Sequence, residues 1–233
     1  LMVATLAEAA AEAVNADPVV CRVGSYFHDI GKMKRPMFFS ENQIAGENPH
    51  NTLSPRMSKL IIASHTKDGV DFAKKYKLPK VLQDIMLQHH GTALVSFFFT
   101  QALKTEEISN IQGTKEEFRY PGPKPQFKEA GIIMMADTIE AAVRAMEKPS
   151  PTKIENLINK LINDKITDGQ LSECPLSLKD IEDIRNTFLK VFRGMYHSRI
   201  DYQEEMKNIA EKPVKKDSAL ENSESKEKKK ANA

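Results

Sequence analysis

The sequence has 233 residues, of which 40% are hydrophobic and 28% are charged, the balance of a soluble globular chain with one large domain or at most two. No apolar run approaches the roughly 20 residues that span a bilayer, and two distant cysteines without a CxxC pair exclude a disulfide scaffold and suit a reducing compartment. The net charge of +2 comes from residues 211–233, which hold seven Lys and five acidic residues, so the rest of the chain is neutral and gives no reason to expect a DNA or RNA partner.

Helical periodicity begins at the first residue. Because no capping residue precedes it, we expect this helix to start upstream and the chain to be an N-terminally truncated fragment of a longer protein. Asp17-Pro18 then predicts the start of a second helix, with an N-cap and a proline in the first turn, which runs to His28. The apolar positions expected to face the core in these two helices are Leu1, Val3, Leu6, Ala9, Ala10, Ala13, Val19, Val20, Val23 and Tyr26.

A polar loop is predicted over residues 32–53, and further helices follow it. Ser54-Pro55 opens one that has His65 and three apolar residues at core-facing spacing, and Leu78-Pro79 opens another that Gly91 closes. The stretch "VSFFFTQALKTEE" predicts a helix, and the proline-rich stretch at 119–126 predicts a loop. The three apolar residues that accompany His65 are Met57, Leu60 and Ile61.

The last third of the chain also reads as helical. "KEAGIIMMADTIEAAVRAME" is a strongly apolar helix, and two capping boxes, Thr152 with Glu155 and Ser177 with Asp180, begin the next two. We find no internal repeat and no convincing strand. The sequence therefore predicts an all-α bundle of about seven to nine helices, with one domain over 1–206 and a disordered charged tail over 207–233.

Four of the six histidines lie at or near the ends of apolar helices: His28, His65, His89 and His90. Any one of them alone is explained by a hydrogen bond within the core. The stretch "YFHDIGK" can likewise be a plain helix end, with Gly31 as its cap.

Two carboxylates near these histidines favour a metal site over these simpler explanations. Asp29 directly follows His28, and Asp137 lies on an otherwise apolar helix, where a lone buried carboxylate calls for a cation. Four histidines on three helices with two such aspartates favour a metal site, whereas His50 lies in a loop and is excluded from the ligand set.

The order HD, H, HH and D resembles the HD-domain metal-dependent phosphohydrolases over residues 1 to about 202. The stretches "HDIGK", "NPHNTLSP", "QHHGT", "FRYPGPKPQFKEAGIIMMADTIEAAVRA" and "YHSRIDY" narrow the resemblance to the cytoplasmic HD domain of the seven-transmembrane HD receptors. That group includes the PgpH-type cyclic di-AMP phosphodiesterases. The region 1–206 is accordingly expected to be an HD phosphohydrolase domain.

The resemblance implies two divalent metal ions, with iron or manganese expected. Asp29 would bridge them, His28 and Asp137 would hold one, and the other would be held by His65, His89 and His90. The family pattern has a further histidine on the first helix, just upstream of Leu1, so one ligand of the first metal is expected to lie outside this chain.

The implied reaction is hydrolysis of cyclic di-AMP to linear pApA by a metal-activated hydroxide, in second-messenger turnover. Asp29 and Lys32 are the expected catalytic residues. Glu140 could orient a ligand, and Phe118 could stack on a base. The expected substrate contacts are Lys32, Tyr120, Lys124, Arg144, His197 and Arg199, although for most of them a solvated loop or an ion pair explains the residue equally well.

Two other functions stay open. One is a phosphohydrolase acting on mononucleotides, and the other is a non-catalytic HD module that senses a ligand. The resemblance also implies upstream transmembrane and extracellular sensor regions and a place at the cytoplasmic face of the plasma membrane for the full-length protein, with this fragment soluble. A homodimer is left open, and only the resemblance chooses adenine over guanine.

Overall fold

The computed structural model describes the backbone of residues 1–43 and 48–210, and side chains as far as residue 195. Two compact units divide the chain, Leu1–Arg193 and Gly194–Ala233. The predicted boundary at residue 206 stays a prediction, and the tail predicted over 207–233 lies outside the described residues from 211 onward. Among the described residues no helix is both long and apolar enough to cross a bilayer.

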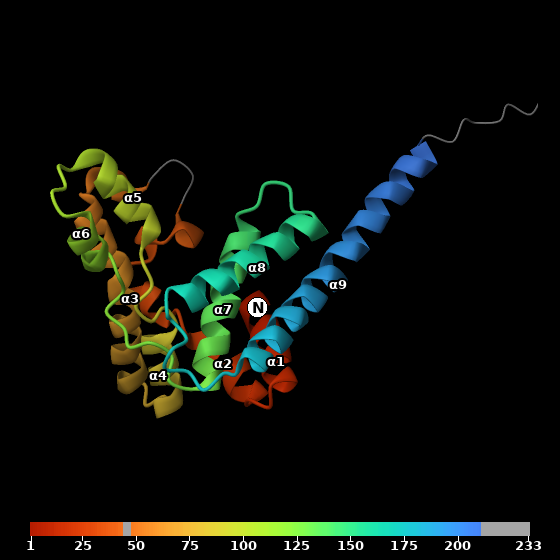
Figure 1. Ribbon diagram of the computed structural model, residues 1–233, viewed down its shortest axis with the longest axis horizontal. Helices are drawn as coiled ribbons and strands as arrows, with labels where there is room; N and C mark the ends of the chain where they lie inside the picture. The colour runs from red at the N-terminus through yellow and green to blue at the C-terminus, as the bar shows by residue number, and fades with distance from the viewer. Residues whose placement is uncertain (44–47, 211–233) are drawn as a thin grey trace, which may run out of the picture. The chain divides into compact units, whose positions relative to one another are not determined.

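The described part of the chain is helical, as predicted (Figure 1). Within residues 1–43 and 48–210, extended segments pair only at one isolated bridge, between Leu94 and Arg119. Nine α-helices lie in the described ranges: α1 (Met2–Ala13), α2 (Pro18–Phe27), α3 (Pro55–Lys75), α4 (Lys80–Gln88), α5 (Ser96–Thr105), α6 (Ile111–Glu117), α7 (Lys128–Arg144), α8 (Pro151–Thr167) and α9 (Leu178–Ala210).

Several helix starts follow the predicted capping chemistry. The carboxylate of Asp17 accepts from the backbone N–H groups of Val19 and Val20 at the start of α2, and Ser54 caps α3. Ser177 and Asp180 exchange hydrogen bonds at the start of α9. The proposed box at Thr152 is wrong, because Ser150 caps α8 and Pro151 occupies its first turn.

The connection predicted as a polar loop over 32–53 is more regular than expected. Four short 3₁₀ helices lie in and before it: η1 (Ile30–Lys34), η2 (Pro36–Phe38), η3 (Ser40–Asn42) and η4 (Pro49–Thr52). Helix α6 was also missed, since its seven residues are too few to show an apolar period. The loop over 119–126 is confirmed.

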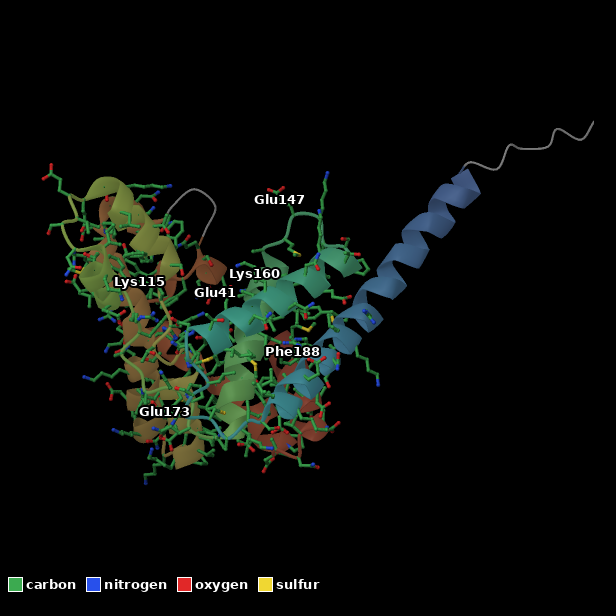
Figure 2. The ribbon with its side chains drawn as sticks, viewed as in Figure 1. Glu41, Lys115, Glu147, Lys160, Glu173 and Phe188 are labelled. Atoms are coloured by element: carbon green, nitrogen blue, oxygen red, sulfur yellow. The ribbon has the colours of Figure 1, made fainter. Side chains whose placement is uncertain are left out.

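Helix α7 is the centre of the first unit and packs against α1, α2, α4 and α8. Its residues 130–136 are buried without interruption, as expected for a helix covered on all sides. Figure 2 labels Phe188 of α9, which is also fully buried in this unit. The polar Asp137 therefore follows directly on the most apolar stretch of the fold.

The prediction of which residues of α1, α2 and α3 face the core was partly wrong. Val19 and Tyr26 of α2 are 66% and 47% exposed, whereas Gly24 is buried. A Cβ on Gly24 would lie 2.6 Å from Ile85 Cδ1, so the small residues of α2 face the core because α4 approaches closely. Similar corrections apply to Leu1, Ala13, Met57 and Leu60, which are exposed, while Ala4, Ala7, Ala11 and Ala63 are buried.

Candidate metal centre

Close packing of η1 on α3 brings Asp29 to the site. Helix α2 ends at Phe27, His28 caps it, and Asp29 precedes η1. A Cβ on Gly31 would lie 1.9 Å from the backbone oxygen of His65 and 2.5 Å from the backbone nitrogen of Gly69. Only glycine fits there, so Gly31 allows the backbone approach that sets Asp29 beside His65.

The predicted ligands come together in two groups that share one residue. Asp29, His65, His89 and His90 form the imidazole-rich group, and His28, Asp29 and Asp137 form the carboxylate-rich group. Within each group one potential ligand atom of every member lies within 4.8 Å of the others. Asp29 Oδ1 is 3.3 Å from His65 Nε2, and Asp29 Oδ2 is 3.2 Å from His28 Nε2.

Backbone carbonyls orient three of the four imidazoles. Nδ1 of His28, His65 and His89 lies 2.8, 2.6 and 2.9 Å from the carbonyl oxygen three residues earlier in the chain. A carbonyl can only accept, so each Nδ1 carries a proton and donates it. Each ring then turns Nε2 toward the centre, the arrangement in which metal-binding histidines are held by a second hydrogen bond.

The centre leaves polar atoms without hydrogen-bond partners, which fits a bound cation. His28 Nε2 and Asp29 Oδ1 are buried and make no hydrogen bond. Nε2 of His65 and Nε2 of His89 are 3.2 Å apart, although both Nδ1 atoms carry the proton. Lone pairs that face each other in a buried site need a cation between them, and imidazole and carboxylate donors suit divalent first-row metals.

The two groups shift the pKa values of their histidines in opposite directions. Burial lowers the pKa of His89 to about 3, with the neighbouring His28 and His65 adding to the effect. Burial also holds the pKa of His90 well below its usual value. At His28 burial acts in the same direction, but the carboxylates of Asp137 and Asp29 outweigh it and raise the pKa to about 10.

The carboxylates of the centre stay ionised. Burial alone would raise the pKa of Asp29, yet His28, His65 and Lys32 hold it well below its usual value. The pKa of Asp137 is also lowered, because His28 offsets the effect of burial. The centre thus combines two anions with neutral imidazoles at His89 and His90 and a protonated His28, which has to lose its proton before it can bind a metal.

Lys32 is placed beside the ligands, as predicted. Its Nζ lies 2.7 Å from Asp29 Oδ2 and 2.7 Å from Glu41 Oε1, and 5.3 Å from the ring centre of Phe39. Asp29 and Glu41 raise the pKa of Lys32 although burial lowers it. The ammonium group is therefore charged and held on the wall of the site.

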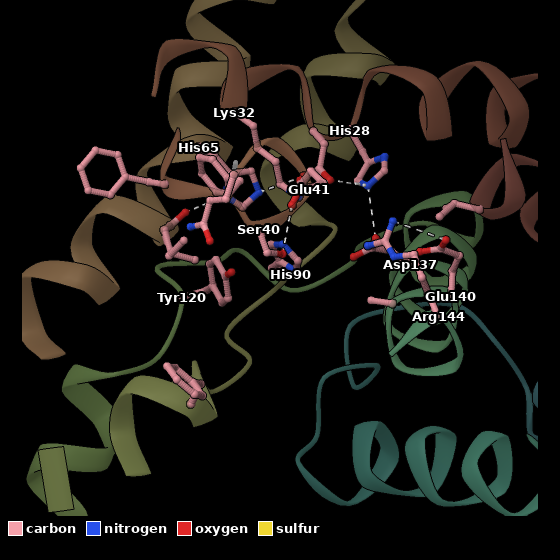
Figure 3. Close-up of a pocket in the computed structure, with 18 of the residues that line it drawn as sticks. His28, Lys32, Ser40, Glu41, His65, His90, Tyr120, Asp137, Glu140 and Arg144 are labelled. Carbon is pink, nitrogen blue, oxygen red and sulfur yellow. Dashed lines mark hydrogen bonds and ion pairs between the residues drawn. The ribbon is translucent and has the colours of Figure 1, made fainter. Parts of the chain in front are cut away.

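A cavity of about 670 Å³ opens over both groups. Figure 3 shows His28, His65, Lys32 and Asp137 around this space, and Arg144 also lines it. The guanidinium of Arg144 lies 3.6 Å from Glu140, so both predicted residues of this turn line the cavity and pair with each other.

The remaining predicted contacts differ in their placement. Tyr120 lines the cavity, but one face of its ring stacks on His90 with centroids 4.3 Å apart. Lys124 donates to Ser172 and does not line the cavity. Phe118 is 1% exposed in a core cluster, so the prediction that it stacks on a base is wrong.

Two predicted substrate contacts have side chains that the structure does not describe, and His50 lies apart from both ligand groups. The side chains of His197 and Arg199 are not described, so their predicted roles stay predictions. His50 is in neither ligand group and packs between Phe38 and Phe98, although it lines the cavity wall.

Three residues near the centre were missed by the sequence analysis. Glu41 pairs with Lys32, Asp68 binds the segment after Asp29, and Lys165 of α8 lies near enough to interact electrostatically with His90. Glu41 lies nine residues after Lys32 in the connection between α2 and α3, Lys165 lies on a helix far along the chain from His90, and neither residue follows a motif. The position of Asp68, one helical turn after His65, was a usable signal.

Comparison with known proteins gives consistent matches. Residues 1–142 match the family model described as HD domain. The chain is 52% identical over 209 residues to the cyclic-di-AMP phosphodiesterase PgpH of Bacillus subtilis (strain 168), covering 90% of this chain and 29% of that protein. It is 44% identical over 205 residues to the PgpH of Listeria monocytogenes serotype 1/2a (strain 10403S), covering 88% and 28%.

A solved structure matches at the level of the fold as well. The crystal structure of the L. monocytogenes phosphodiesterase PgpH HD domain in complex with cyclic-di-AMP superposes with a TM-score of 0.79 at 44% identity, covering 84% of this chain and 89% of that one. The chain thus spans nearly all of this solved domain but less than a third of the length of the curated relatives.

Proposed function

The chain belongs to the HD domain family, and on this basis we propose that it is a metal-dependent phosphodiesterase that hydrolyses cyclic di-AMP to linear pApA. The observation that carries the proposal is the pair of ligand groups that share Asp29 at the base of one cavity. Support for the substrate comes from the relatives named as cyclic-di-AMP phosphodiesterases and from the related domain crystallised with that molecule.

The proposed cofactor is a pair of divalent cations, with iron or manganese as the first candidates. The imidazole-rich group would hold one and the carboxylate-rich group the other, with Asp29 common to both. When bound, such a pair supplies Lewis acidity and a water nucleophile at neutral pH. The residues of the chain then have to hold the phosphodiester and balance the charge that develops on it.

Charged side chains of the cavity wall fit that task. Lys32 is fixed between Asp29 and Glu41, so its ammonium group is in place to interact with a phosphoryl oxygen near Asp29. Arg144 lines the same cavity as Asp137 and is suited to the second phosphate of a cyclic dinucleotide. Tyr120 offers its remaining ring face to a base, while Lys124, His197 and Arg199 stay predicted contacts.

The reaction adds one water across one P–O3′ bond. The nucleophile joins phosphorus, the 3′-oxygen leaves and takes up a proton, and the product is a linear dinucleotide with a 5′-phosphate. We propose catalytic roles for Asp29, which both ligand groups share, and for Lys32, whose ammonium group contacts Asp29. In the longer protein we propose that the domain acts in second-messenger turnover at the cytoplasmic face of the membrane, controlled by upstream sensor regions.

The test is a comparison of substrates with protein that has been stripped with chelator and reloaded with Mn²⁺ or Fe²⁺. Chromatography would follow cyclic di-AMP, cyclic di-GMP and a nucleoside triphosphate, and bis(p-nitrophenyl) phosphate would report phosphodiester cleavage without a base. We expect pApA from cyclic di-AMP as the fastest reaction. Hydrolysis of the mononucleotide alone would favour the mononucleotide phosphohydrolase, and ligand binding without any turnover would favour the sensing module.

A further inference from the structure

A buried carboxylate outside the cavity anchors the segment that follows Asp29. Asp68 lies on α3 and its side chain is 9% exposed. Its Oδ1 accepts a hydrogen bond from Lys34 at 2.6 Å, and its Oδ2 accepts one from Arg35 at 3.0 Å. Ser64 Oγ, also on α3, lies 3.0 Å from Oδ2. One carboxylate thus binds both cations at the end of η1.

The anchor matters because η1 buries little apolar surface. Gly31 is its only buried residue, and Met33 is 70% exposed. Burial of apolar side chains therefore contributes little to its position. The backbone contact of Gly31 with His65 and Gly69 fixes the start of η1, and Asp68 fixes its end.

Asp68 also connects the anchor to a metal ligand. His65 and Asp68 lie three residues apart on α3, on one face of the helix, and this face meets η1. Asp29 immediately precedes η1. A displacement of η1 along α3 would therefore change the 3.3 Å approach of Asp29 Oδ1 to His65 Nε2.

We propose that Asp68 is a positioning residue of the metal centre, which clamps Lys34 and Arg35 to α3 and so holds Asp29 beside His65. The proposal rests on the proposed metal centre but not on the identity of the phosphodiester. Asp68 is ionised at neutral pH, because Lys34, Ser64 and Arg35 lower its pKa although burial raises it.

The experiment measures metal affinity and stability separately. Chelator-stripped Asp68→Asn and parent protein are titrated with Mn²⁺ by calorimetry, and the melting temperature of each metal-free protein is recorded. The matched control is Asp71→Asn, an exposed position on the same helix. We expect Asp68→Asn to weaken Mn²⁺ binding about tenfold, the lower range for residues that support metal ligands, and Asp71→Asn to leave it unchanged.

A second set of variants breaks the clamp from its other side. Lys34→Met with Arg35→Met removes two half-exposed side chains and should weaken Mn²⁺ binding to a similar extent. Adding Asp68→Asn to this pair should produce less than the sum of the two losses, since all three remove one interaction.

Two results would overturn the proposal. One is a lower melting temperature with unchanged Mn²⁺ affinity, which would make Asp68 a structural residue only. The other is full additivity of the two sets of substitutions. Mn²⁺ binding without turnover of cyclic di-AMP would refute the proposed substrate and leave this inference standing, whereas a parent protein that binds no Mn²⁺ would refute the centre and the inference together.

Discussion

The two ligand groups share Asp29 but are built by different physical means. In the imidazole-rich group the side chains of His65 and His89 are 1% and 0% exposed, and Asp29 is the only carboxylate. In the carboxylate-rich group Asp137 is 19% exposed and two carboxylates surround one imidazole. Burial therefore dominates the first group and charge dominates the second.

This difference sets what each group does without metal. Burial keeps His89 uncharged, with a pKa of about 3, so the imidazole-rich group has lone pairs ready for a cation. The carboxylates around His28 raise its pKa to about 10, so a proton neutralises part of the charge there. One chain thus forms an imidazole-rich site with lone pairs open to metal and a carboxylate-rich site that must release a proton to bind it.

Replacing the shared residue should abolish the function of both groups. For Asp29→Ala in protein loaded with excess metal, we expect hydrolysis to fall at least about a hundredfold, a loss of about 2.7 kcal/mol or more in the transition state. Initial rates with cyclic di-AMP would measure this, with Asp71→Ala as the exposed control. Activity above about a tenth of the parent value would contradict the role of Asp29 in both groups.

Forcing η1 away from α3, without removing any ligand, should be nearly as damaging to the protein. In Gly31→Ala the new Cβ would lie 1.9 Å from the backbone oxygen of His65, and the backbone of α3 cannot yield by that much. We expect a loss of about 3 kcal/mol in the free energy of unfolding, measured by urea denaturation of metal-free protein.

The matched glycine variant is Gly194→Ala. Nothing lies within 4 Å of a Cβ at this exposed position in helix α9. It should stabilise the protein by about 0.5–1 kcal/mol, because alanine is the better helix former. Equal losses in the two variants would show that the tight approach of η1 to α3 is not what Gly31 provides.

The candidate ligands could be picked out in the sequence because ligand chemistry is local. A histidine or aspartate on an apolar helix stands out against its neighbours, and Asp17 and Ser54 mark helix starts by their capping atoms alone. The order of these residues also carried the family resemblance. What determines the distance between Asp29 and His65 is the absence of a side chain at Gly31, and a helix-capping glycine looks the same in a sequence.

The sequence did not reveal which side chains pair across separate segments of the fold. The ion pair of Lys32 with Glu41 and that of Arg35 with Asp68 join segments whose approach depends on the packed fold. The prediction of the buried faces of α1 and α2 failed for a related reason. Closely packed helices bury alanine and glycine, and a search for large apolar residues selects the wrong face.

The opposite pKa shifts of the two groups predict a stability maximum near neutral pH in metal-free protein. His89 binds protons more weakly when folded, so its contribution is present above the unfolded value of about 6.5 and is lost as pH falls toward about 3. His28 binds protons more strongly when folded, so its contribution is present below about 6.5 and is lost as pH rises through about 10.

We therefore expect the free energy of unfolding to decrease on both sides of about pH 6.5, by no more than about 1.4 kcal/mol per pH unit for each histidine. Urea denaturation in chelator between pH 5 and 9 would measure it. His28→Gln should flatten the alkaline side most, because Asp137 and Asp29 then lose their protonated partner, and it should lessen the acid-side decline slightly, because His28 adds to the lowering of the pKa of His89. A decline in stability above pH 7 that persists in this variant would contradict the assignment to His28.

The smallest effect is expected at Arg144, on the rim of the carboxylate-rich side. Its side chain is 63% exposed and its pair with Glu140 is 3.6 Å long, so it contributes little to stability. For Arg144→Gln we expect an unchanged melting temperature but a rise of about three- to tenfold in KM for cyclic di-AMP, because a cation facing the second phosphate is lost. Bis(p-nitrophenyl) phosphate has no second phosphate, so its KM should not change.

The control is Arg193→Gln, which breaks an exposed pair with Glu155 away from the cavity and should change the KM of neither substrate. A change in kcat for both substrates with KM unaltered would place Arg144 at the reacting phosphate instead, and would make the two sides of the centre less different than their charges suggest.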